Sequence, residues 1–67
     1  MTSGRELEAA FARCGLKKST VAKHLGISLN SLRRKTVNQC DFKMSEVKKL
    51  SELLALSDEE VRTIFFA

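Results

Sequence analysis

The chain has 67 residues, a mass of 7.5 kDa, a net charge of +4 and a pI of about 9.4. A chain this short forms one small domain, and a basic balance in such a domain favours a polyanionic partner. Its two cysteines cannot build a disulfide framework, and a single histidine without a Cys-x-x-Cys motif argues against a zinc site. No apolar run exceeds four residues, which is too short for a membrane-spanning helix. We therefore expect one cytoplasmic domain over residues 1–67, with no membrane segment, metal, cofactor or small-molecule substrate.

The positive charge is concentrated in the middle of the chain. Residues 13–49 carry ten basic and two acidic residues, whereas residues 1–12 and 50–67 carry net charges of −1 and −3. This uneven distribution indicates that the middle segment contacts the anionic partner.

Apolar residues recur with helical spacing along the chain, and no segment alternates with the period of a strand. The first helix is predicted to start at Ser3, which forms a Ser-x-x-Glu capping box with Glu6, and to end at Gly15. Its buried stripe comprises Leu7, Ala10, Phe11 and Cys14. A second helix is predicted over residues 18–25 with Val21, Ala22 and Leu25 inward, and a third over residues 29–36 with Ser28 as its N-cap.

In the second half of the chain, the sequence pattern predicts a loop over residues 37–41 and two more helices. The fourth helix begins near Lys43 or Met44, capped by Lys43 or by Ser45, with Phe42 packing on Val47 if Lys43 is the cap. Its buried face comprises Met44, Val47, Leu50, Leu53 and Leu54. Ser57 and Glu60 form a second capping box, and the fifth helix buries Ile64, Phe65 and Phe66, unless Phe66 is exposed in a dimer interface. The predicted fold is all-α, with five short helices.

Residues 21–32 have the features of a helix-turn-helix. Two short helices that cross steeply need a small residue where they meet and a residue that tolerates positive φ in the turn, and Ala22 and Gly26 meet these needs. The inner faces carry the apolar anchors Val21, Leu25, Ile27 and Leu32.

This segment, with one helix before it and two after it, resembles the helix-turn-helix of the lambda-repressor-like family of Cro and phage repressors. The resemblance covers nearly the whole chain and places the motif at about residues 18–36. Three positions depart from the family pattern: Lys17 and Lys43 stand where many members have a Thr or Ser cap, and Ala55 where many have Gly.

The resemblance implies that the third helix, residues 29–36, enters the major groove of double-stranded DNA. Carried over by position, the base-reading residues are Leu29, Asn30, Arg33 and Arg34, and the phosphate-contacting residues are Lys17, Lys18, Ser31, Lys35 and Lys43. Asn pairs with adenine, Arg with guanine, and Leu contacts a thymine methyl group. The expected function is a sequence-specific transcriptional regulator of phage or prophage type, a homodimer on DNA in the bacterial cytoplasm or nucleoid.

Other interpretations remain open. Arg33, Arg34 and Lys35 are also typical of a solvated helix face, and Leu29 also suits the core or a protein contact. The alternative function is a protein-interaction module of the same fold that binds a partner repressor or toxin. An enzyme is not expected, because the chain has no nucleophile–base pair, metal-ligand set or phosphate-binding glycine loop.

Overall fold

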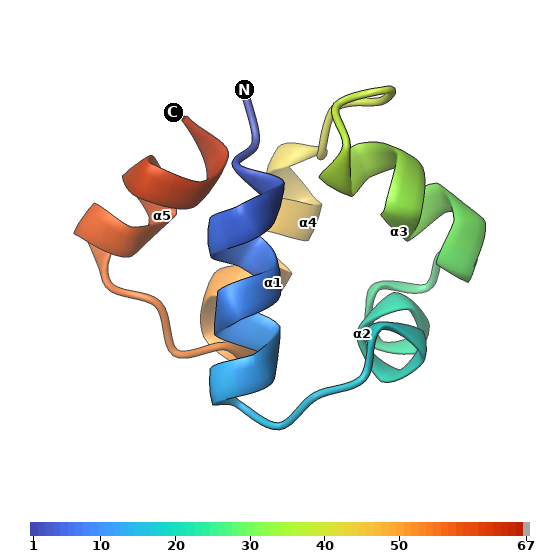
Figure 1. Ribbon diagram of the computed structural model, residues 1–67, viewed down its shortest axis with the longest axis horizontal. Coiled ribbons are helices and arrows are strands. Elements are labelled where there is room, and N and C mark those ends of the chain that lie inside the picture. The colour runs from blue at the N-terminus through green and yellow to red at the C-terminus, as the bar shows by residue number, and fades with distance from the viewer. Residues whose placement is uncertain (67) are drawn as a thin grey trace.

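Five short helices make up the domain in the computed structural model, which describes residues 1–66 (Figure 1). In chain order they are α1 (Gly4–Arg13), α2 (Lys18–Leu25), α3 (Leu29–Thr36), α4 (Met44–Leu53) and α5 (Asp58–Phe65). In Figure 1, α1 lies in the centre with α4 behind it, α5 lies on one side, and α2 and α3 lie on the other. The predicted all-α class is confirmed, and residues 1–66 contain no strand. Ala67, the last residue of the predicted domain, lies outside the described residues.

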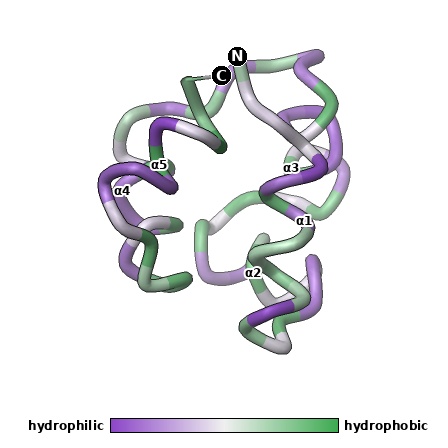
Figure 2. The backbone as a smooth tube through the Cα atoms, turned by 60° about the vertical axis from the view of Figure 1, so that its left-hand side comes forward, coloured by the Kyte–Doolittle hydropathy of each residue, from purple (hydrophilic) through white to green (hydrophobic). Residues whose placement is uncertain are grey.

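All five helices contribute to one core. Figure 2 shows hydrophobic and hydrophilic residues along the same helices, as expected where each helix turns one face inward. The buried apolar residues are Leu7, Ala10, Phe11, Val21, Ala22, Leu25, Leu32, Val47, Leu50, Leu54, Ile64 and Phe65. Helices of eight to ten residues are marginal alone in water, so their stability comes from this shared packing.

Three residues that the sequence assigns to the core are exposed. Cys14 follows the last residue of α1, where the chain turns away, and its Sγ lies 3.7 Å from the Leu54 carbonyl oxygen at the surface. Met44, the first residue of α4, is 70% exposed, and Phe66, beyond the end of α5, is 57% exposed. In each case the helical spacing is right, but the residue lies at a helix end, where no neighbouring helix covers it.

Four helices are followed, one or two positions after their last residue, by a residue with positive φ, in the Schellman pattern. In each, the N–H of the next residue donates to the carbonyl group five residues before it, at 2.8–3.0 Å. The four residues are Gly15 (φ 68°), Gly26 (φ 72°), Asn38 (φ 65°) and Ala55 (φ 52°). Glycine adopts this conformation freely and Asn tolerates it, but the Cβ of Ala55 makes it unfavourable.

The helix starts agree only partly with the predicted caps. The Ser57–Glu60 box is complete, with both bonds at 3.1 Å. Ser3 caps α1 through the Glu6 N–H at 3.4 Å, but its own N–H donates to the Ile64 carbonyl oxygen at 2.6 Å, so the box is half formed. At α4 the cap is Lys43, whose backbone N–H donates to the Glu46 carboxylate at 2.8 Å, and this decides between Lys43 and Ser45.

The first residues of the chain join the end of α3 to the end of α5. The N–H of Thr2 donates to the Asn38 Oδ1, and the Asn38 amide donates back to the Thr2 carbonyl oxygen, both at 2.9 Å. A Cβ on Gly4 would lie 2.7 Å from the Thr36 carbonyl oxygen, closer than such contacts allow. Only glycine therefore lets α1 approach the last turn of α3 this closely.

A buried ion pair fixes the same end of α3 against α4. Lys35 Nζ lies 2.7 Å from the Glu46 Oε1, and the two side chains are only 11% and 9% exposed. The ammonium group also lies 5.9 Å from the centroid of the Phe42 ring, which packs edge-on against Phe65. Burial alone would raise the pKa of Glu46, but hydrogen bonds from Lys35 and from the Lys43 N–H outweigh it and lower the pKa.

We expect Ala55→Gly to raise the free energy of unfolding by about 0.5–1 kcal/mol, because it removes a Cβ from a left-handed residue that lies on the surface. Urea denaturation measures the change. The matched control is Ala9→Gly, an exposed alanine inside α1, which should lower stability by about 0.5–1 kcal/mol. A loss of stability in Ala55→Gly would contradict the strain assigned to this turn.

We expect Glu46→Gln to lower the free energy of unfolding at neutral pH by about 1–3 kcal/mol, because it leaves the buried Lys35 ammonium without its counter-charge. Since the folded pKa of Glu46 is depressed, its contribution is present above the unfolded pKa of about 4.3 and is lost as the pH falls through the folded value. Urea titrations between pH 3 and 7 should show a shallower acid loss in the variant. Glu52→Gln removes an exposed carboxylate from the same helix and should show the same pH dependence of stability as the unmodified chain. If Glu46→Gln also shows that pH dependence, the ion pair does not contribute to stability.

Candidate nucleic-acid interface

The turn between α2 and α3 is held by backbone bonds and a small residue. The N–H groups of Gly26 and Ile27 donate to the carbonyl oxygens of Lys23 and Ala22 at 3.1 and 3.0 Å. Ala22 is buried, as expected for the small residue where the two helices meet. Ser28 then caps α3, with its Oγ accepting the Ser31 N–H at 3.1 Å. Only the three residues 26–28 therefore separate α2 from α3, which is the spacing of a helix-turn-helix.

Helix α3 has a buried face and an exposed face. Leu32 and Thr36 are buried one turn apart, and the Thr36 hydroxyl donates to the Leu32 carbonyl oxygen at 2.8 Å, so it needs no other partner. Exposed residues occupy the opposite side at i, i+3 and i+4, namely Asn30, Arg33 and Arg34, and Val37, directly after the last residue of the helix, continues the spacing at i+7. We call these four residues the outer face of α3. It presents an amide, two guanidinium groups and an apolar side chain to solvent, next to one another.

Three of the four predicted base-reading residues share this outer face. Asn30, Arg33 and Arg34 are exposed, and neither arginine forms an ion pair with any residue of the described part of the chain. Leu29 lies apart from them, half-buried at the edge of the inner face beside Leu32. Its partial burial is consistent with its position three residues before Leu32 on the helix.

The predicted phosphate-contacting residues are divided between two ends of the motif. Lys17 and Lys18 are exposed at the start of α2, where Lys18 forms a surface ion pair with Glu8. Lys43 is exposed at the start of α4. Ser31 is half-buried, and its hydroxyl is hydrogen-bonded to the Ser28 hydroxyl at 3.0 Å.

Lys35 differs from the sequence expectation. The sequence groups it with Arg33 and Arg34, but α3 rotates it to the side facing α4, where Glu46 neutralises it. A largely buried and paired ammonium group is not free to contact a phosphate without breaking the ion pair, so Lys35 positions the helix instead.

Two residues relevant to this surface were missed in the sequence. Val37 extends the outer face by one turn from Arg33 and Arg34, and the i, i+7 spacing from Asn30 was a signal for it. Glu46 received no structural role from the sequence, and the structure buries it against Lys35. Nothing in the local sequence marks this pairing, because the two residues lie in different helices.

The described residues offer no support for two other kinds of site. Residues 1–66 contain no group of three histidine, cysteine or acidic side chains placed to hold a metal ion. None of the helices within these residues has the length and apolar character to cross a membrane.

Comparison with known proteins gives one finding. Residues 3–35 match the family model described as "Bacterial regulatory protein, Fis family". The matched segment holds 33 of the 67 residues and contains α1, α2, the turn and nearly all of α3, while α4 and α5 lie outside it. No curated protein and no solved structure matches the chain significantly. The match supports a DNA-binding helix-turn-helix in general, and not the lambda-repressor-like type in particular. The chain is thus an all-helical domain with a helix-turn-helix, and over residues 3–35 it is similar to a family of bacterial regulatory proteins.

Proposed function

We propose that this protein is a sequence-specific transcriptional regulator that reads the major groove of double-stranded DNA with α3. The observation that carries the proposal is the outer face of α3, where Asn30, Arg33 and Arg34 stand together in solvent while Leu32 and Thr36 anchor the opposite side in the core. These side chains are the donors and acceptors that pair with adenine and guanine in the major groove. Leu29, half-buried and apart from these three residues, contacts a thymine methyl group at the edge of the site.

Lysines on either side of α3 are suited to hold the DNA backbone. Lys17 and Lys18 lie at the start of α2, where free backbone N–H groups and the helix dipole also favour a phosphate. Lys43 lies beyond the other end of α3, and Ser31 is in its first turn. These contacts fix the position of the domain on the duplex, and the outer face of α3 then reads the sequence.

We further propose a lambda-repressor-like regulator of phage or prophage type that binds as a homodimer in the bacterial cytoplasm or nucleoid. Its support is the presence of α4 and α5 after the motif, which the matched family model does not cover. On a two-fold operator, the half-sites would lie about 34–36 Å apart or a multiple of that distance. No catalysis is part of this function.

The second candidate function is a protein-interaction module that binds a partner repressor or toxin. The observation in its favour is Val37, which is 63% exposed on the same face as the two arginines. An exposed apolar residue next to two arginines suits a protein partner as well as it suits a base.

A gel-shift experiment separates these candidates. The purified chain should shift duplexes enriched from a random pool at about 150 mM salt, an ionic strength at which exposed charges are already well screened. Sedimentation of the same complexes gives the stoichiometry. If no duplex is enriched and a shift needs the product of a neighbouring gene, the protein-interaction module is the better description.

We expect Arg34→Ala to relax sequence preference at one base pair, because a bidentate arginine–guanine contact contributes about 1–3 kcal/mol of discrimination. Binding to duplexes varied at each position of the enriched site measures this. Arg62→Ala removes an exposed arginine from α5, on the other side of α1, and should leave the preference unchanged. An equal loss on every sequence would refute the assignment of Arg34 as a reader.

We expect Lys17→Ala to weaken binding to all duplexes alike and to reduce the slope of log K against log salt by about 0.9, the value for one phosphate contact. The control is Lys49→Ala, which removes an exposed lysine from α4. If the two variants behave alike, the effect reflects net charge only, and the assignment of Lys17 to a phosphate is wrong.

A further inference from the structure

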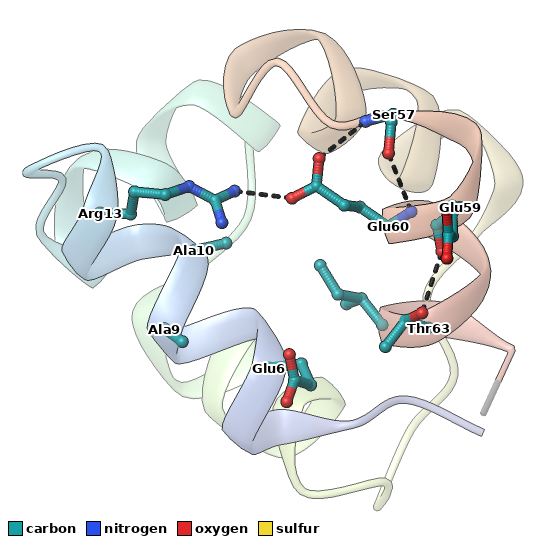
Figure 3. Close-up of a pocket in the computed structure, with 9 residues that line it drawn as sticks. Glu6, Ala9, Ala10, Arg13, Ser57, Glu59, Glu60 and Thr63 are labelled. Carbon is teal, nitrogen blue, oxygen red and sulfur yellow. Dashed lines mark hydrogen bonds and ion pairs between the residues drawn. The ribbon is translucent and has the colours of Figure 1, made fainter.

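A cleft of about 190 Å³ lies between α1 and α5 (Figure 3). Its floor is apolar and its rim is charged. The residues that line it are Glu6, Ala9, Ala10, Arg13, Ser57, Glu59, Glu60, Thr63 and Ile64. The alanines leave it open, because a larger side chain at either position would fill the space between the helices.

The cleft carries more negative than positive charge. At one end Glu60 accepts hydrogen bonds from the Ser57 N–H at 3.1 Å and from Arg13 at 3.0 Å, and Figure 3 shows its side chain reaching between the two helices. The bond from Ser57, helped by Arg13, lowers the pKa of Glu60 and keeps it ionised. Glu6 and Glu59 form no ion pair within residues 1–66. Three carboxylates against one guanidinium give the cleft a net charge of −2.

The cleft lies away from the outer face of α3. Figures 1 and 2 both place α5 and α3 on opposite sides of the molecule. A ligand in the cleft therefore leaves the outer face of α3 uncovered, and the two surfaces can be occupied together.

We propose that the α1–α5 cleft is a docking site for a segment of a partner protein that bears an exposed lysine or arginine. The long stem of such a side chain packs on Ala9 and Ile64, and its charged head lies among the rim carboxylates, where Glu6 and Glu59 provide uncompensated charge. The attraction of a basic side chain to the cleft does not depend on DNA binding by α3, but the choice of a separate partner over a second copy rests on that proposed function.

Charge and position favour a partner protein over the other occupants. Nucleic acid and anionic lipid are repelled by the carboxylates of the rim. A second copy would have to present its own cationic segment, residues 13–49, which includes the outer face of α3. Such an arrangement would cover the surface that the domain needs for DNA, whereas a separate basic partner would not.

The test uses the full chain and a defined probe. An acetylated and amidated octapeptide of alternating lysine and alanine is added to ¹⁵N-labelled protein at about 150 mM salt, so that only close charges contribute. We expect amide shifts that map to the cleft on α1 and α5. The double variant Glu6→Gln/Glu59→Gln should bind about fivefold more weakly, as expected for the loss of two partly exposed charge pairs.

Further variants make the result decisive. Ala9→Lys places an ammonium group in the cleft, at an exposed helical position that accepts lysine readily. This variant should also bind the peptide more weakly. Glu52→Gln, a carboxylate outside the cleft, should bind the peptide normally. Binding of duplex DNA should be at least as strong in the cleft variants as in the unmodified chain, so a failure of this site is distinct from a failure of the DNA interface.

Three results would overturn the proposal. Peptide shifts could spread over exposed carboxylates elsewhere, such as Asp41 and Glu52, which would show non-specific attraction. Both cleft variants could bind the peptide as well as the unmodified chain. Sedimentation could show self-association that the cleft variants abolish, which would identify a second copy as the occupant.

Discussion

The ion pair between Lys35 and Glu46 is the constraint that sets the orientation of α3. Arg33, Arg34 and Lys35 are consecutive, and a helix separates consecutive side chains by about 100°. Leu32 and Thr36 face the core, so Arg33 and Lys35 lie on opposite flanks of the buried face, and the flank that carries Lys35 packs against α4, where an unpaired cation would be unfavourable. Glu46 resolves this conflict, because it neutralises the cation that turns inward and at the same time caps the start of α4. The two arginines are then presented outward by a helix whose rotation is fixed.

Local rules in the sequence account for most of the fold. Capping at Ser28 and Ser57, and the glycines at 15 and 26, set the bounds of the helices, because each depends on residues only a few positions apart. The exposure of Asn30, Arg33 and Arg34 could be predicted for the same reason, from their helical spacing relative to the buried Leu32, whereas the burial of Thr36 was not predicted.

Features that depend on the packing of distant segments could not be predicted. The bond of the Ser3 N–H to the Ile64 carbonyl oxygen replaces half of a capping box, and the Thr2–Asn38 pair joins residues 36 positions apart. Lys35 was misplaced because its partner lies in another helix. Ala55 shows another limit: a turn normally marked by glycine forms here at an alanine, since the hydrogen bonds and packing of α4 and α5 outweigh the strain of one Cβ.

The separation of charge along the sequence becomes a separation in space. The cationic segment folds into α2, α3 and the start of α4, while the acidic ends of the chain contain most of α1 and all of α5. A charged polymer approaching the molecule is attracted by one side and repelled by the other, so encounters are oriented before any contact forms. Under the proposed function, the acidic cleft would contribute to recognition at α3 even when empty, because it would disfavour complexes in which DNA lies against α1 and α5. The same carboxylates that would hold a basic partner would then also limit the ways in which this small domain binds a duplex.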